Sequence, residues 1–110
     1  MSANIREIQA TDYDRDVLGT NEPVVVDFFS TECPPCEALA PKYEAVAAQF
    51  EGRVQFLKVF RQGNRELAAK LGVTSSPTLI FFKGGKEVGN RLTGDIKRSD
   101  IKAAVESLVG

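Results

Sequence analysis

The sequence contains no histidine. This absence excludes Ser-His-Asp triads, Cys-His nucleophiles and metal sites built on histidine, because each of them needs an imidazole nitrogen. The chain does contain two cysteines, Cys33 and Cys36, and these thiols are the first candidates for chemistry.

Long runs of Lys or Arg are also missing, since 14 basic and 15 acidic residues give a formal net charge of −1. We therefore expect no nucleic-acid partner, because phosphate binding needs clustered positive charge. No apolar stretch approaches the length of a membrane span, and residues 1–10 lack the charged and apolar regions of a secretory signal. These absences predict a cytoplasmic protein without a membrane partner.

What is present is the composition of a soluble globular protein, with 43% hydrophobic and 26% charged residues. A chain of 110 residues fits one compact domain, here residues 1–110, and we find no internal repeat or linker. We expect this domain to be a monomer.

Segments with strand patterns alternate with segments of helical periodicity. Gly84 and Gly85 form a strong turn signal between two strands, and Gly72 stands where a helix would end. A weak capping box at Thr11 and Asp14 predicts a first short helix. The expected strands are residues 4–8, 24–29, 54–60, 78–82 and 88–92, and the other expected helices are residues 36–50 (kinked at Pro41), 64–72 and 99–109.

Residues 24–29 and 54–60 are joined by a helix, so they should be parallel neighbours in the centre of the sheet, connected by a right-handed crossover. Cys33 then lies just past the carboxyl end of the first of these strands. Open α/β sheets place their functional sites at this edge.

The motif Cys33-Pro34-Pro35-Cys36 lies between the end of a strand and the start of a helix. Unpaired N–H groups at a helix start favour an anion, so a thiolate is stabilised there. Because the residue before a proline avoids helical geometry, Cys33 should stand outside the helix and be presented, with Cys36 behind it in the first turn. The spacing favours reversible formation of a disulfide.

Two other interpretations of the cysteines remain open. They could be unreactive buried thiols, or they could be half of a zinc site. Zinc needs about four ligands, so without histidine only a site that bridges a dimer would suffice. A C-x-x-C pair beside a βαβ pattern favours redox chemistry, and we expect no metal and no cofactor.

Asp27 interrupts the apolar strand 24–29, and Lys58 interrupts the neighbouring strand 54–60 in the same way. If Asp27 is buried, its pKa should be raised, because an isolated carboxylate is costly in an apolar setting. The alternative is that one or both residues mark a solvated strand face.

Taken together, three stretches of the chain resemble the thioredoxin family over nearly the whole length. They include the Asp-Phe dipeptide before the cysteines, the proline in the following helix, the Pro-Thr dipeptide that opens a strand and the Gly-Gly hairpin. The resemblance implies an α/β thioredoxin fold, with a central mixed sheet of five strands flanked by helices on both faces. The three stretches are residues 24–50, 56–60 and 66–89.

The same resemblance implies a protein thiol–disulfide oxidoreductase. In that family the first cysteine, here Cys33, attacks the disulfide of a client protein and the second, Cys36, resolves the mixed disulfide. The residue matching Asp27 is a buried acid that helps to move the proton of Cys36, and the residue matching Lys58 lies close to it.

The resemblance also implies how a substrate binds. The bond between Ser76 and Pro77 is expected to be cis and to face Cys33, and the backbone at Ser76 is expected to pair with the substrate's extended chain, as in a small β-augmentation. We place Pro34 and Pro35 among the substrate-binding residues. From the sequence alone, Pro77 could equally be a plain strand breaker.

The chain departs from the family at the motif. Thioredoxins usually carry Trp-Cys-Gly-Pro-Cys-Lys, whereas here Glu32 and Glu37 flank the cysteines and tryptophan is absent. A family acid after the third strand is replaced as well, in the stretch 60–62. These changes lie on the surface that would meet partners, so the resemblance does not identify the reductase that recycles the protein.

Pro34 and Pro35 have no N–H, so Cys33 can draw mainly on the N–H of Cys36. Glu32 and Glu37 add negative charge beside the same sulfur. Both effects disfavour the thiolate and predict a reductant. Strain from the prolines would act in the opposite direction, and an oxidant, an isomerase or an adaptor with a dedicated partner are the alternatives.

Overall fold

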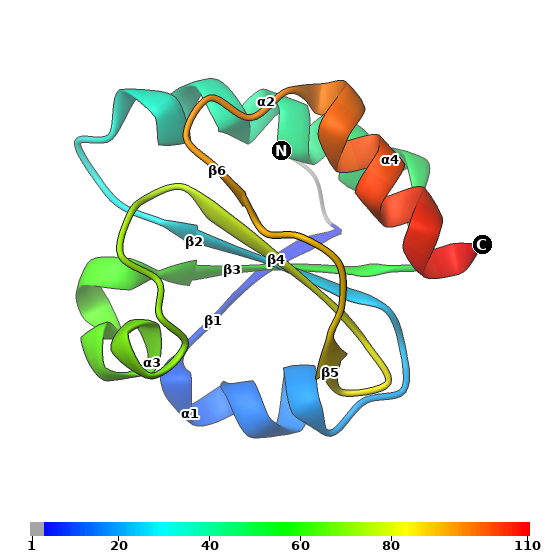
Figure 1. Ribbon diagram of the computed structural model, residues 1–110, viewed down its shortest axis with the longest axis horizontal. Helices are drawn as coiled ribbons and strands as arrows, with labels where there is room; N and C mark the ends of the chain where they lie inside the picture. The colour runs from blue at the N-terminus through cyan, green and yellow to red at the C-terminus, as the bar shows by residue number, and fades with distance from the viewer. Residues whose placement is uncertain (1–3) are drawn as a thin grey trace.

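A mixed β-sheet separates two helical layers in the structure, a computed structural model that describes residues 4–110 (Figure 1). Helices α2 and α4 cover one face of the sheet, and α1 and α3 cover the other. The strands are β1 (Ile5–Ile8), β2 (Val24–Phe29), β3 (Gln55–Phe60), β4 (Thr78–Lys83), β5 (Lys86–Glu87) and β6 (Leu92–Thr93), and the helices are α1 (Ala10–Tyr13), α2 (Pro34–Gln49), α3 (Arg65–Lys70) and α4 (Arg98–Val109).

The centre of the sheet matches the prediction from the sequence. Strands β2 and β3 are parallel neighbours in the order β1-β3-β2-β4-β5, and Asp27 lies opposite Lys58 in their register. Strand β4 runs antiparallel to β2 on its other side. The carboxyl ends of β2 and β3 therefore meet at one edge, where the chain continues into Cys33.

The first helix begins earlier than predicted. It starts at Ala10, and the backbone N–H of Gln9 donates to the carboxylate of Asp12 at 3.0 Å. The predicted capping box at Thr11 and Asp14 is wrong, because the reciprocal pair lies two residues earlier. The helical path then continues as a π-helical turn, Asp14–Leu18.

The predicted strand 88–92 is also wrong. The chain forms two short strands, β5 and β6, that both pair with β4, so six strands occupy five positions in the sheet. Gly89 has a φ of +69°, a left-handed conformation that interrupts the strand. The hairpin at Gly84 and Gly85 is as predicted, and a Cβ on Gly85 would collide with the carbonyl oxygen of Leu18.

Helix α2 begins at Pro34 rather than at residue 36 and continues through Pro41 to Gln49. Helix α3 ends as predicted, with Gly72 at a φ of +71° just beyond it. These two helices lie on opposite faces of the sheet and both approach the edge that carries the cysteines (Figure 1).

The core consists of one apolar cluster on each face of the sheet. Alternate residues of β2 serve the two clusters: Val25 packs under α2 and α4, whereas Val24, Val26 and Phe28 pack against the side of α1 and α3. Asp27 shares its face with Val25, so the carboxyl group points toward the layer of α2.

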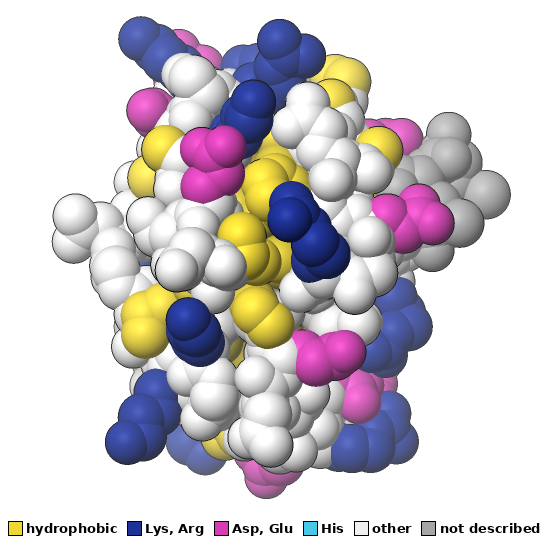
Figure 2. Space-filling model, turned by 90° about the vertical axis from the view of Figure 1, so that its right-hand side faces the viewer, with side chains coloured by type: hydrophobic (Ala, Val, Ile, Leu, Met, Phe, Trp, Pro, Cys, Tyr) yellow, Lys and Arg dark blue, Asp and Glu magenta, His cyan; other side chains and the backbone are white. Residues whose placement is uncertain are grey.

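The end of the molecule at the C-terminus of α4 carries a strip of hydrophobic side chains bordered by charged ones (Figure 2). A cavity of about 250 Å³ between β4 and α4 is lined in part by Val88, Ala104 and Leu108. Within residues 4–110, no helix has the length and apolar character that crossing a membrane requires.

Candidate functional site

Cys33 and Cys36 form a disulfide at the start of α2, with their Cα atoms 5.2 Å apart. Cys33 has extended backbone angles and stands just outside the helix, whereas Cys36 lies in the first turn, as the sequence predicts. Pro34 and Pro35 occupy the first two helical positions and are exposed.

The start of α2 offers few backbone N–H donors to the sulfur of Cys33. The N–H of Cys36 donates to Sγ of Cys33 at 3.3 Å, and the next N–H, that of Glu37, donates to the backbone oxygen of Cys33 at 3.0 Å. Pro34 and Pro35 have no N–H to give. Within residues 4–110, one backbone donor therefore serves this sulfur, as the motif predicts.

Exposure does not separate the two cysteines. Each is 9% exposed in the disulfide form, so the expected contrast between a presented Cys33 and a hidden Cys36 is absent. Their neighbours differ instead, because Sγ of Cys33 lies 3.6 Å from the carbonyl oxygen of Ser76, whereas Cys36 lines a cavity with Asp27.

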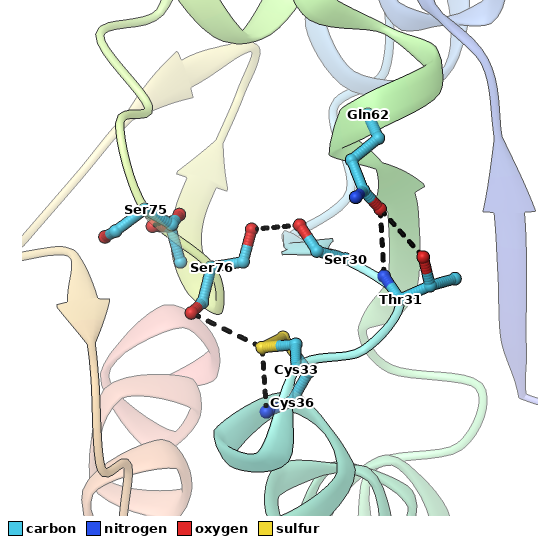
Figure 3. Close-up of a disulfide and its surroundings, with 8 residues drawn as sticks. Ser30, Thr31, Cys33, Cys36, Gln62, Ser75 and Ser76 are labelled. Atoms are coloured by element: carbon cyan, nitrogen blue, oxygen red, sulfur yellow. Dashed lines mark hydrogen bonds between the residues drawn. A yellow bond between two sulfur atoms is a disulfide. The ribbon is translucent and has the colours of Figure 1, made fainter.

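The loop before β4 packs against the disulfide (Figure 3). The Ser76–Pro77 peptide bond is cis, as the resemblance implies, and Pro77 is buried while Ser76 is half-buried. The Ser76 and Ser30 hydroxyl oxygens are hydrogen-bonded at 2.6 Å, which ties this loop to the segment that leads from β2 to the cysteines.

A second tether holds the cysteine loop on its other side (Figure 3). The Oε1 atom of Gln62 accepts hydrogen bonds from the backbone N–H of Thr31, at 2.9 Å, and from the Thr31 hydroxyl, at 3.1 Å. The loop after β3 is therefore fixed to the segment that leads into Cys33.

Asp27 is buried, at 7% exposed, and its Oδ1 atom has no hydrogen-bond partner in the described part of the chain. Burial raises the pKa of this carboxyl to about 7, although the positive charge of Lys58 acts to lower it. The solvated-face alternative is wrong for Asp27, which is a buried acid able to exchange a proton near neutral pH.

Lys58 lies beside Asp27 in the sheet but forms no ion pair with it within 4 Å. Its Nζ atom lies 5.2 Å from the centre of the Phe29 ring, in a cation–π contact. Lys58 is half-buried, so it contributes a positive charge near Asp27 without neutralising it by contact.

A cavity of about 200 Å³ joins these groups. Its lining includes Asp27, Lys58, Cys36 and Tyr43, so the buried acid and the second cysteine face the same cavity. Tyr43 fixes α2 above this space, because its hydroxyl donates to the backbone oxygen of Leu57 in β3 at 2.7 Å. A cavity of this volume with polar groups on its wall is large enough to hold water.

The chemistry of the site rests on sulfur and carboxyl groups. Among residues 4–110, no group of three or more His, Cys, Asp and Glu side chains is placed to hold a metal ion. The disulfide, the acid with a pKa near neutrality and the adjacent Ser76 carbonyl together suit thiol–disulfide exchange with an extended chain.

Comparison with known protein families agrees with this geometry. The family model described as thioredoxin matches residues 4–107. The chain belongs to the thioredoxin family. With its Cys33–Cys36 pair, it is a thiol–disulfide oxidoreductase.

Thioredoxins from distant organisms are similar to this chain. The thioredoxin of Peptoclostridium acidaminophilum is 37% identical over 110 residues and covers 100% of both chains. Thioredoxin-2 of Saccharomyces cerevisiae is 42% identical over 100 residues, which is 91% of this chain and 93% of that protein. The crystal structure of Malassezia sympodialis thioredoxin superposes with a TM-score of 0.84 at 28% identity, covering 96% of this chain and 91% of that one.

Sequence reasoning missed Ser30, Thr31 and Gln62 as parts of the site, and it treated Tyr43 only as an apolar helix residue. A hydroxyl directly after a strand is a weak signal for Ser30. Nothing in the local pattern of the sequence points to Gln62, because its partner is 31 positions away.

Proposed function

We propose that this thioredoxin-family protein reduces the disulfides of client proteins, with Cys33 as the attacking residue and Cys36 as the resolving one. The Cys33 thiolate attacks a client sulfur, a Cys33–client disulfide forms, and the displaced client thiolate takes up a proton. Cys36 then attacks Sγ of Cys33, which closes the Cys33–Cys36 disulfide and releases the second client thiol. Two electrons and two protons pass to the client.

The shared cavity of Asp27 and Cys36 is the observation that carries this proposal. In our proposal, the Asp27 carboxylate accepts the proton that Cys36 loses when it attacks. A pKa of about 7 suits this task, because the acid can be charged before the transfer and neutral after it. Lys58 favours the charged form from a distance.

In our proposal, the client chain lies against the Ser76 carbonyl and contacts Pro77 and the exposed Pro34 and Pro35. The 3.6 Å contact between Ser76 and Sγ of Cys33 supports this placement, because backbone pairing at Ser76 would hold a client sulfur beside the attacking one.

The reducing direction is supported by the count of donors to the Cys33 sulfur, which is one backbone N–H in the described part of the chain. Fewer donors leave the thiolate, and with it the dithiol state, less stabilised. We propose that the protein works as a monomer in the cytoplasm, where disulfides are kept reduced. A reductase then returns its own disulfide to the dithiol. Such a cycle would carry electrons to client proteins and maintain the redox balance of the cell.

Reduction of insulin by dithiothreitol tests the proposal. The wild-type protein should accelerate precipitation of the insulin chains, and Cys33→Ser should be no faster than dithiothreitol alone. Equal rates for the two proteins would favour an adaptor in which the cysteines are incidental.

A further inference from the structure

A basic groove adjoins the disulfide on the side of α3. It has a volume of about 500 Å³, and Arg61 and Arg65 are the charged residues that line it. Ala68 and Val73 contribute apolar wall, and no Asp or Glu of residues 4–110 takes part in the lining.

Both guanidinium groups lack a carboxylate partner. Within residues 4–110, neither Arg61 nor Arg65 takes part in an ion pair. The Nε atom of Arg65 has one long hydrogen bond, 3.4 Å, to the backbone oxygen of Gln62. The Nε atom of Arg61 is buried without a hydrogen-bond partner among the described residues. A buried donor without an acceptor is destabilising, because its lost hydrogen bond to water is not replaced.

The groove is continuous with the site of thiol exchange. Gln62 lines it and is hydrogen-bonded to Thr31, two residues before Cys33. Thr74 lines it on the other side and is two residues before Ser76, the residue in contact with Cys33. Two extended residues span at most about 7 Å, so a client chain seated at Ser76 would place its flanking residues within reach of the groove.

We propose that this groove binds an acidic segment of the client, close to the cysteine that Cys33 attacks. Arginine matches a carboxylate with two parallel hydrogen bonds, and the Nε–H of Arg61 has no acceptor among residues 4–110. The inference rests on the proposed reduction of client disulfides and adds to it a class of preferred client.

The test compares two disulfide peptides that differ only in the residues flanking the cysteine, three Asp in one and three Asn in the other. Pre-reduced wild-type protein should reduce the Asp peptide about fivefold faster, and the preference should shrink at 0.5 M salt, because charge pairs at a surface are modest and screened. Equal rates for the two peptides would overturn the groove proposal.

A double variant, Arg61→Gln with Arg65→Gln, locates the effect. It should reduce both peptides at the rate that the wild type shows for the Asn peptide. The matched control is Lys70→Gln, which removes an exposed positive charge from α3 outside the groove and should keep the preference. Retention of the preference in the double variant would contradict the proposal.

A binding measurement separates this inference from the proposed function. Versions of the two peptides without cysteine are added to the oxidised wild-type protein, and the Nε–H resonances of Arg61 and Arg65 are followed by NMR. The Asp peptide should shift them and the Asn peptide should not. Selective shifts without reduction of either disulfide peptide would contradict the proposed reductase activity and support binding in the groove. Reduction of the disulfide peptides without selective shifts would contradict binding in the groove alone.

Discussion

The two faces of the sheet are built differently, and adjacent residues of β2 show the contrast. Phe28 belongs to the cluster on the side of α1 and α3, where the packed side chains of β2 are Val24, Val26 and Phe28. Asp27 points to the other face, beneath α2, where a carboxyl group and a cavity interrupt the apolar packing next to Cys36.

One face of the sheet contributes mainly to the stability of the fold, and the other holds the groups that carry out the chemistry. A fully packed face gains free energy from every buried methylene group, whereas the face beneath α2 gives up part of that gain to keep an ionisable acid near a cysteine. Substitutions on the two faces should therefore change different measured quantities.

Removal of the resolving thiol should have the largest effect. Cys36→Ser leaves Cys33 able to attack but unable to be released, so catalytic turnover should fall by roughly a thousandfold and mixed disulfides with clients should accumulate through Cys33. Non-reducing gel electrophoresis with mass spectrometry detects them. Cys33→Ser is the control, and trapping through Cys36 at the same yield would reverse the assignment of the attacking residue.

On the face of the sheet that α1 and α3 cover, Phe28→Ala should lower the free energy of unfolding by about 3–5 kcal/mol, because it leaves a cavity where a fully buried ring packs. Urea unfolding measures the loss. Insulin reduction per folded molecule should remain close to wild type. A loss below about 1 kcal/mol would mean that this face is not closely packed.

Asp27→Asn, unlike Phe28→Ala, should raise the free energy of unfolding at pH 8. The carboxyl has a pKa of about 7 when folded against an ordinary 3.8, so folding takes up a proton between these values and wild-type stability falls as the pH rises from about 4 to 7. This loss amounts to about 4 kcal/mol at most, whereas the amide of the variant does not titrate and carries a constant burial cost of about 2 kcal/mol. The variant should therefore be more stable than wild type by about 2 kcal/mol at pH 8 and less stable by about 2 kcal/mol at pH 4.

Urea unfolding of both proteins at the two pH values checks this, and resolution of mixed disulfides should be slower in the variant. A variant less stable than wild type at pH 8 would show that Asp27 is held by Lys58, contrary to the absence of an ion pair between them.

The smallest effect should come from the tether between loops. Ser30→Ala removes the hydroxyl that contacts Ser76 and should cost about 1 kcal/mol of stability, together with a slower attack on client disulfides. Ser75→Ala, at an exposed neighbouring position, is the control. If both substitutions cost the same, the contact between the two serines does not hold the Ser76 loop in place.

The features of the site that depend on neighbouring residues in the chain can be predicted from the sequence. The spacing of Cys33 and Cys36, the two prolines between them and the interruption of an apolar strand by Asp27 are all visible in short windows. The parallel pairing of β2 with β3 follows from the helix between them. For these features, the prediction and the structure agree.

The remaining features depend on contacts between distant positions. Ser30 and Ser76 are 46 residues apart, and neither shows in the sequence that the other is its partner. The break between β5 and β6 depends on the left-handed conformation of Gly89, which an alternating pattern does not reveal. The equal exposure of the two cysteines follows from packing around the disulfide and not from the motif.

The reduction potential tests the central claim, that this site is a reductant because, within the described residues 4–110, one backbone N–H donates to the Cys33 sulfur. Equilibration of the protein with glutathione buffers, read by mass spectrometry after alkylation, gives the value directly. We expect a potential of about −270 mV, the value of thioredoxin. A potential at or above about −200 mV, in the range of glutaredoxins, would contradict it.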